Sequence, residues 1–291
     1  MLNGIVVKAY NSFYYIQTGS RIVSCKLRGR FKKERFSLTV GDEVTYILTG
    51  ADKGVIEDIL PRRSLLKRPL VANVDQVVLT FAAVNPDINP ALVDRFLVVA
   101  EFSELEIILC INKMDLANAD AIARLTERYQ QIGYRVLAVA AKMGVGIDSL
   151  RTLLHDKITV FAGPSGAGKS TLLNALQPGL ELVTGEVSHK IGRGKHTTRF
   201  AELLPLAGGG FVVDTPGFSY TDFADMAEVQ LMDYFPEIAG LAPACKFSTC
   251  LHFKEPQCAV KQAVADNRIH PDRYQAYIEI LTEIKESKKG Y

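Results

Sequence analysis

Hydrophobic residues follow two different patterns along the chain. Up to residue 66 they form short β-branched or aromatic runs, including 13–16, 36–40 and 44–48, and Gly, Asn and Ser separate these runs. Short strands bounded by turn-forming residues predict a small barrel, and an OB-like barrel fits their number and spacing. The segment 61–69 has a proline at each end and four basic residues between them, and we expect it to be a linker.

From residue 73 onward, near-continuous apolar strands alternate with helical segments, which predicts a mostly parallel sheet covered on both faces. The predicted strands are 74–84, 105–111, 134–140, 158–162, 199–206 and 210–214, and the predicted helices are 90–103, 119–131, 147–156 and one that opens at Gly168. After Ser219 the sequence becomes helical and loop-rich, including a helix at 271–288. We therefore expect three domains: an OB-fold domain at 1–66, an α/β domain at 73–218 and an α-helical domain at 219–291.

The composition indicates a folded globular protein. Of 291 residues, 48% are hydrophobic and 23% are charged, and the net charge is only +2. These values exclude global disorder and do not indicate a partner. No apolar run reaches the roughly 18 residues of a transmembrane helix, and the N-terminus lacks the pattern of a secretory signal. Five cysteines without such a signal favour a reducing cytoplasm over a disulfide framework. We expect a cytoplasmic monomer with no membrane partner.

The strongest motif is a glycine-rich loop between a predicted strand and a predicted helix. Residues 163–170 match G-x-x-x-x-G-K-[ST] in full. The backbone N–H groups of such a loop bind phosphate oxygens, while Lys169 neutralises the β and γ phosphates and Ser170 holds Mg²⁺. The alternative is a simple glycine-rich turn into a helix, which the complete motif and its context disfavour. The candidate phosphate-binding residues are Gly163, Pro164, Ser165, Gly166, Ala167, Gly168, Lys169, Ser170 and Thr171.

Three shorter motifs also follow predicted strands. In N-K-M-D at 112–115, the Asp115 carboxylate can accept hydrogen bonds from the N1–H and the 2-amine of guanine, donors that adenine lacks. In the D-T-P-G motif, Asp214 can hold Mg²⁺ through water and the N–H of Gly217 can meet a γ-phosphate. The stretch Ala-Ala-Lys at 140–142 can hold the base. The candidate base-binding residues are Asn112, Lys113, Met114, Asp115, Ala141 and Lys142.

Each short motif is weak by itself, because D-x-P-G is a common turn and N-K-x-D also suits a helix N-cap. All four motifs, however, fall at the carboxyl ends of predicted strands, where open α/β sheets bind ligands. The combination predicts a GTP-binding domain that resembles the TRAFAC-type GTPases. In those proteins the phosphate-binding loop comes first, whereas here the base-binding motifs precede Gly163, so the sequence looks circularly permuted. After Gly217 the chain runs directly into the C-terminal segment.

Three cysteines and one histidine cluster in that segment, in the pattern Cys245-x₄-Cys250-x-His252-x₅-Cys258. Three thiols and one imidazole match a closed tetrahedral zinc site. The alternative, buried free cysteines with one surface histidine, is the less common use of such a cluster in a reducing compartment. Because four protein ligands leave no open position, we expect one structural Zn²⁺ per chain.

With these parts in place, the whole chain resembles the RsgA (YjeQ) family of bacterial ribosome-assembly GTPases. The resemblance implies an N-terminal OB-fold, a central circularly permuted P-loop GTPase domain and a C-terminal zinc domain. It also implies a GTP/GDP cycle with Mg²⁺, rRNA binding, hydrolysis stimulated by the small ribosomal subunit and a role in its late maturation. The stretch 26–35 contains six Lys or Arg residues near aromatic side chains, which suits RNA binding and a solvated loop equally well.

The residue that activates water is left open by the sequence. Phe218 occupies the position where many such GTPases place a water-orienting glutamine, so slow intrinsic hydrolysis is expected. The stretch 194–198 resembles the family's G-x-H-T-T segment, in which His196 is implicated in hydrolysis. The alternative is a mobile surface histidine. Either Thr197 or Thr198 is expected to close over Mg²⁺.

Other classes of function have specific tests. An RNA-binding assembly module that uses GTP only as a binding switch is favoured by Phe218, and GTP turnover with and without ribosomal subunits separates it from a GTPase. An ATPase or kinase is opposed by Asp115, and nucleotide competition decides that question. A GTPase that acts on tRNA or on membranes is supported by no motif.

Overall fold

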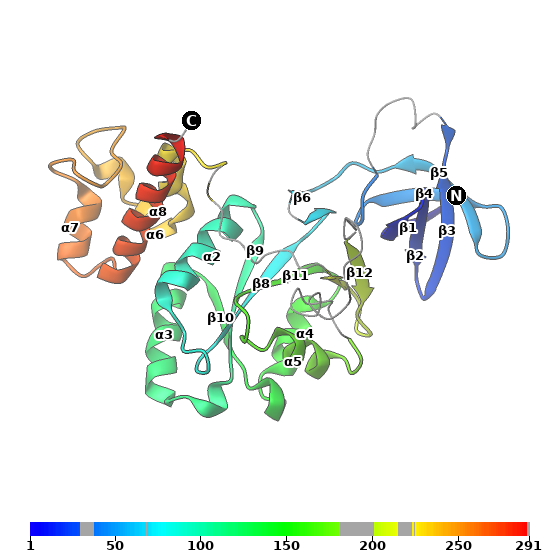
Figure 1. Cartoon of the computed structure of the whole chain (residues 1–291), viewed down its shortest axis with the longest axis horizontal. Coiled ribbons are helices and arrows are strands. Elements are labelled where there is room, and N and C mark those ends of the chain that lie inside the picture. The colour runs from blue at the N-terminus through cyan, green and yellow to red at the C-terminus, as the bar shows by residue number, and fades with distance from the viewer. Residues whose placement is uncertain (30–37, 68, 181–200, 215–222, 224, 290–291) are drawn as a thin grey trace, which may run out of the picture. The chain divides into compact units, whose positions relative to one another are not determined.

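A computed structural model describes residues 1–29, 38–67, 69–180, 201–214, 223 and 225–289 (Figure 1). Internal contacts divide the chain into two units. The first unit contains Met1–Val78, Gly144–Ala162 and Lys169–Ser219, and the second contains Leu79–Met143, Gly163–Gly168 and Tyr220–Tyr291. Among the described residues, no helix is both long enough and apolar enough to cross a membrane.

The first unit begins with a closed five-stranded barrel. Its strands are β1 (Leu2–Tyr10), β2 (Phe13–Thr18), β3 (Arg21–Leu27), β4 (Glu43–Leu48) and β5 (Lys53–Ile59). β1 pairs antiparallel with both β2 and β4, and β3 pairs parallel with β5, so the ladder has no open edge. The alternating inward side chains form a separate core, which consists of Val6, Ile16, Val23, Cys25, Leu38, Val44, Tyr46 and Ile56. The predicted N-terminal barrel is confirmed.

Two details of the N-terminal prediction differ from the structure. The strand expected at 36–40 is absent from its described part, because Leu38–Val40 form a turn that is fixed when Thr39 N donates to Asp42 Oδ2 (2.7 Å). The linker expected at 61–69 contains β6 (Leu65–Lys67), which pairs with β7 (Leu70–Ala72) as a hairpin. The start of this linker is fixed to the barrel, because the Arg62 guanidinium donates twice to the buried Asp42 carboxylate, at 2.6 and 2.8 Å.

The rest of the first unit is an α/β sheet that continues into the barrel. Its strand order is β11 (Ile158–Ala162), β13 (Phe211–Asp214), β12 (Glu202–Pro205) and then β1. β11 and β13 are parallel, whereas β12 is antiparallel to β13 and meets β1 at the single pair Lys8↔Glu202. Two helices, α4 (Ile147–Leu154) and α5 (Lys169–Leu176), pack against each other in this unit.

The second unit contains the other strands of the α/β fold. β8 (Gln76–Ala82) begins in the first unit and continues into the second, where the order is β10 (Arg135–Ala138), β9 (Glu106–Asn112), β8. β9 and β10 are parallel, as predicted, and β8 is buried at all seven positions. Helix α2 (Pro90–Phe102) packs on β9, and α3 (Ala119–Ile132) packs on β10 (Figure 1).

The C-terminal part of the second unit is helical, as predicted. It contains a 3-10 turn at Glu228–Tyr234 and the helices α6 (Pro236–Ala239), α7 (Ala259–Ala265) and α8 (Pro271–Lys289). Its core includes Leu231, Phe235, Ile238, Val260, Tyr277 and Ile280. Val98 of α2 belongs to the same core, so this module is completed by a helix of the α/β domain. The predicted order of an N-terminal barrel, a central α/β fold and a C-terminal helical module is thus confirmed.

Candidate functional site

The buried side chain of Asn112 joins three of the predicted nucleotide-binding segments. It stands at the end of β9 and is 1% exposed. Its Oδ1 accepts from the backbone N–H of Lys113 (2.8 Å) and of Ala141 (3.2 Å), and its Nδ2 donates to the Ala167 carbonyl (3.1 Å). The structure therefore brings the N-K-M-D motif, the Ala-Ala-Lys loop and the glycine-rich loop together within the second unit.

The Lys113 side chain joins the glycine-rich loop to the turn that precedes α2. Its backbone is left-handed (φ 62°), and its Nζ donates to the carbonyl oxygens of Gly166 (2.8 Å) and Asn85. Pro86 also lies beside this loop, because a Cβ added to Gly166 would stand 3.1 Å from the Pro86 Cδ. The turn at Asn85 and Pro86 was not among the predicted site residues. No motif marks it, since its role depends on residues far away in the chain.

The first glycine of the loop is needed for a close backbone approach. Gly163 has φ +134°, and a Cβ there would stand 2.0 Å from the Thr80 carbonyl oxygen of β8. A side chain at this position would push the loop away from the strand, and L-residues rarely adopt this φ. The glycine-rich loop is thus seated directly on the end of β8, with Ala167 fully buried beneath it.

The side chains expected to reach the base are exposed beside this cluster. Asp115 lies in the 3-10 turn Met114–Leu116, whose position is fixed because Met114 N donates to the Val139 carbonyl (3.1 Å). Both Asp115 and Lys142 are exposed, which leaves their charged groups accessible to a ligand at this edge. The arrangement offers a carboxylate acceptor next to a backbone-lined loop, which suits a purine with N–H donors.

Other predicted residues fall elsewhere. Lys169, Ser170 and Thr171 open α5 in the first unit, and Asp214 is the last residue of β13 in that unit. Gly217, Phe218, His196, Thr197 and Thr198 lie outside the described residues, as does most of the basic stretch 26–35.

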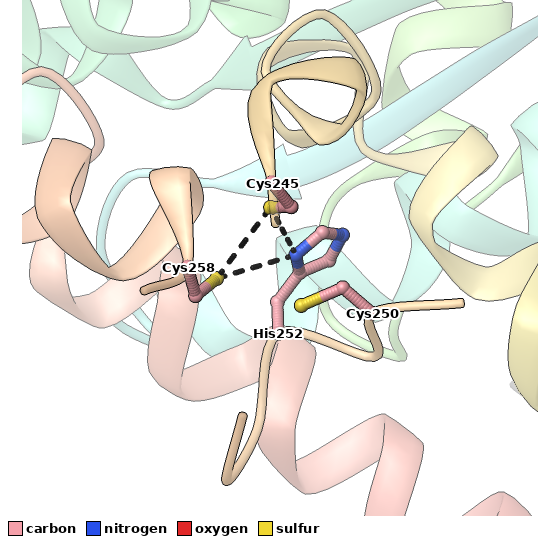
Figure 2. Close-up of side chains that lie close together, drawn as sticks. All are labelled: Cys245, Cys250, His252 and Cys258. Atoms are coloured by element: carbon pink, nitrogen blue, oxygen red, sulfur yellow. Dashed lines mark hydrogen bonds between the residues drawn. The ribbon is translucent and has the colours of Figure 1, made fainter. Parts of the chain in front are cut away.

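The predicted metal ligands form one compact cluster in the C-terminal module. Figure 2 shows Cys245, Cys250, His252 and Cys258 directed toward one another, and their ligand atoms all lie within 4.8 Å of each other. His252 reaches the cluster because its backbone is left-handed (φ 56°), and Cys258 reaches it from the N-cap of α7. His252 Nδ1 stands 3.5 Å from Cys245 Sγ and 3.4 Å from Cys258 Sγ.

These spacings fit a tetrahedral zinc ion. With zinc–sulfur bonds of about 2.3 Å, two ligand sulfurs stand about 3.8 Å apart and a sulfur and a nitrogen about 3.6 Å apart. Cys245 Sγ and Cys258 Sγ are 3.8 Å apart. Burial, with the neighbouring thiols adding to it, raises the pKa of the Cys250 thiol to about 12, and burial lowers the pKa of His252. Burial thus favours the neutral imidazole, as a ligand must be, and a bound cation would favour ionisation of the Cys250 thiol.

The loop around His252 is held by residues outside the motif. Tyr274 and Tyr277 of α8 donate to the carbonyl oxygens of His252 (2.7 Å) and Leu251 (3.0 Å). The Glu255 carboxylate accepts from Leu251 N (3.1 Å) and Phe253 N (2.9 Å). Sequence reasoning missed these supports. The two tyrosines do lie three residues apart on one helix face, which is a detectable signal.

Comparison with known proteins agrees with this geometry. A family model described as RsgA GTPase matches residues 59–224, and a second, described as RsgA N-terminal domain, matches residues 3–56. The chain belongs to the RsgA GTPase family. It is therefore a GTP hydrolase, and family membership implies guanine nucleotide and Mg²⁺.

Full-length relatives support the assignment. The small ribosomal subunit biogenesis GTPase RsgA of Carboxydothermus hydrogenoformans is 47% identical over 290 residues, which are 99% of this chain and 100% of that one. The crystal structure of YjeQ from Thermotoga maritima matches with a TM-score of 0.86 and 39% identity over 97% of this chain and 98% of that chain. The structure of YloQ, described as a circularly permuted GTPase, matches with a TM-score of 0.84 and 41% identity over 98% and 96%. The predicted circular permutation of this RsgA-family chain is confirmed.

Proposed function

We propose that this RsgA-family GTPase acts in the late maturation of the small ribosomal subunit, where it binds rRNA and hydrolyses GTP faster when the subunit is bound. We also propose that it is a cytoplasmic monomer. The proposal is supported by full-length similarity to relatives named for small-subunit biogenesis. The structural observation that supports its GTPase part is that three proposed nucleotide-binding segments meet at the single side chain of Asn112.

The proposed nucleotide site uses the loops for three tasks. The backbone of 163–168 and the side chain of Lys169 bind the phosphates, and Asp115 accepts from guanine while Ala141 and Lys142 line the base. Mg²⁺, when bound, neutralises charge that develops on the phosphates. The residues proposed to hold it are Ser170, Asp214 and Thr197 or Thr198, and Gly217 is proposed to meet the γ-phosphate.

Catalysis in this proposal is mostly a matter of positioning. The glycine-rich loop fixes the phosphates because it rests on β8 and is tied to Asn112 and Lys113. Fixed N–H groups stabilise a charged transition state without reorganising during the reaction. With Phe218 in the usual glutamine position, His196 is proposed to orient the attacking water. Binding to the subunit is proposed to set that histidine in place.

The appended modules have separate proposed roles. We assign residues 1–66 to an rRNA-binding barrel, 73–218 to the GTPase domain and 219–291 to a zinc domain. On the barrel, the Lys26 ammonium lies 5.1 Å from the ring centroid of Phe13, and both side chains are exposed. A cation next to an exposed aromatic face suits phosphate contact combined with base stacking. In the zinc domain, Cys245, Cys250, His252 and Cys258 would hold one structural Zn²⁺.

The test is GTP turnover of the purified protein titrated with small ribosomal subunits. Slow turnover that rises on addition of subunits is expected, and Lys169→Ala should abolish it because the phosphates lose their cation. Subunit binding that depends on GTP without added turnover would instead favour a binding switch.

Base specificity has its own test. Asp115→Asn should weaken GTP binding by about 2–4 kcal/mol, because guanine donors lose their ionised acceptor. Asp120→Asn is the matched control, since Asp120 is an exposed carboxylate in the first turn of α3. Equal GTP affinity of the two variants would show that N-K-M-D does not bind the base.

A further inference from the structure

Arg273 of α8 is the most deeply buried charged side chain of the described C-terminal module, with 0% exposure. Its Nε donates to Glu237 Oε1 of α6 (2.6 Å) and its Nη1 to Asp94 Oδ1 of α2 (2.9 Å). The guanidinium also stands over the ring of Phe235 at 4.3 Å from its centroid. One side chain therefore ties together two helices of the C-terminal module and a helix of the GTPase fold.

The partners of Arg273 extend this contact to α3. Asp94 is itself 0% exposed, and its Oδ1 also accepts from the Tyr129 hydroxyl of α3 (2.9 Å). Tyr134, just before β10, is within hydrogen-bonding range of Arg273 Nη2 at 3.4 Å. Burial alone lowers the pKa of Arg273, but Asp94 and Glu237 outweigh burial and raise it, so the group remains a cation.

Stability alone does not account for this arrangement. Removing charges from water is costly, and apolar residues of similar size often serve as well as a buried ion pair. Here one oxygen of Asp94 and one of Glu237 are buried without a hydrogen-bond partner within the described ranges. What an ion pair adds over apolar packing is a single allowed geometry, in this case the placement of α8 and α6 on α2.

Helix α2 leads from this contact to the nucleotide loops. It begins at Pro90 after the N-cap Asn89, and the turn that precedes it contains Asn85 and Pro86. The Asn85 carbonyl accepts from Lys113 Nζ, and the Pro86 ring abuts Gly166 of the glycine-rich loop. Residues 85–102 are thus held at two places. Arg273 binds the helix α2 at Asp94, and the glycine-rich loop lies against the turn at Asn85 and Pro86.

The helix between these two ends is tightly packed. Phe96 meets Phe81 of β8 edge-on, with ring centroids 5.5 Å apart, while Val98 lies in the core of the C-terminal module. A close-packed helix moves as a body and does not absorb strain locally. A change in how α8 sits on α2 is therefore transmitted to the turn at Asn85 and Pro86.

We propose that Arg273 is a positioning residue for the nucleotide site. By fixing α2, it holds the Asn85–Pro86 turn against Gly166, so the C-terminal module sets the affinity for guanine nucleotide along a route separate from residues 214–217. The inference rests on the proposed nucleotide site. A partner that displaces α8, or loss of order in the C-terminal module, lowers nucleotide affinity by this route.

The experiment measures GDP affinity of the zinc-loaded, full-length protein by calorimetry. Arg273→Met should weaken GDP binding by about 2- to 30-fold, the range of couplings transmitted through packed elements, with the zinc content unchanged. The matched control is Glu283→Gln, which breaks a second ion pair between α2 and α8, Arg95–Glu283 (2.7 Å), where the two side chains are 26% and 46% exposed. That control should change GDP affinity less than twofold. Unchanged GDP affinity in Arg273→Met would overturn the proposal.

A second variant separates positioning from general destabilisation. Pro86→Ala removes the ring that abuts Gly166, and the double variant with Arg273→Met should lose little more than the worse single variant, because both act through one turn. Additive losses would mean that Arg273 acts elsewhere. If Arg273→Met does not fold, Asp94→Asn removes the partner charge at constant shape and takes its place. Wild-type protein that binds no GDP would overturn the proposed nucleotide site itself.

Discussion

The N-terminal barrel and the C-terminal module are held together in opposite ways. The barrel closes its own hydrogen-bond ladder and has a core made only of its own residues. The C-terminal module has helices of four and seven residues beside α8, and its core includes two cysteines of the metal cluster and Val98 of α2. A small module of this kind is expected to gain its order from the proposed metal and from the neighbouring helix, whereas the barrel does not need either.

The two modules also attach differently within their units. The barrel meets β12 through one strand pair and the exposed ion pair Lys8–Glu202. The C-terminal module meets α2 through buried apolar side chains and the buried guanidinium of Arg273. The contact between the barrel and β12 should thus be broken at small cost, and the contact between the C-terminal module and α2 should not.

Loss of the metal should produce the largest difference in stability between the C-terminal module and the barrel. Cys250→Ser is expected to remove zinc and hydrogen-exchange protection from 225–289, while β1 to β5 stay protected. Apparent binding free energies of structural zinc are about 10–16 kcal/mol, larger than the folding free energy of such a small module. Metal analysis and hydrogen exchange measure both effects. A metal-free protein with an equally protected C-terminal module would contradict the zinc site.

Breaking the ion pair between Arg62 and Asp42 should have the next largest effect on stability. Arg62→Met leaves the fully buried carboxylate of Asp42 without its counter-charge, which should cost about 3–5 kcal/mol of barrel stability. Arg63→Met is the matched control, because its ion pairs with Glu43 and Asp75 are 3.5 Å long and its side chain is 61% exposed. Equal denaturant sensitivity of the two variants would show that the Asp42 contact does not stabilise the barrel.

A cavity in α2 should affect two modules together. Val98→Ala removes two buried methyl groups and should cost about 2 kcal/mol. Because Val98 belongs to the C-terminal core, protection should fall both in α2 and in 225–289. Val23→Ala in the barrel core is the counterpart, and its effect should stay within β1 to β5. Loss of protection confined to α2 would mean that the C-terminal module keeps its order without that helix.

The smallest effect is expected where the barrel meets β12. Lys8 and Glu202 are 44% and 37% exposed and form a 2.7 Å ion pair, so Lys8→Ala should cost only about 0.2–1 kcal/mol. The loss should shrink further at high salt. A salt-independent loss of several kcal/mol in thermal unfolding would show that the barrel depends on this contact.

The elements that could be predicted are those with continuous apolar runs and clear ends. The strand predicted at 158–162 coincides with β11, and the helix predicted at 119–131 differs from α3 by one residue because Gly133 caps it in a left-handed conformation. No strand was predicted at the position of β5 (Lys53–Ile59), because a glycine such as Gly54 indicates a turn, whereas here it lies inside the strand. The β6–β7 hairpin was not predicted because Pro69, which lies between its two strands, indicates the end of a linker.

The residues of the candidate site also fall into two groups, those that the sequence predicts and those that it does not. Local motifs predicted Asn112 and the metal cluster, because the residues of each motif are adjacent or closely spaced in the sequence. The turn at Pro86 and the buried Arg273 have no local signature. Their roles come from contacts across the chain, such as the 179 positions that separate Arg273 from Asp94.

That separation has a consequence for biosynthesis. A ribosome that adds about 5–20 residues per second makes Asp94 roughly 10 to 40 seconds before Arg273. During this interval the nascent chain already contains Tyr129, only 35 positions after Asp94, whose hydroxyl hydrogen-bonds the same carboxylate oxygen. The hydrogen bond from Tyr129 can therefore satisfy the Asp94 carboxylate in the unfinished chain, before α8 and Arg273 have been made.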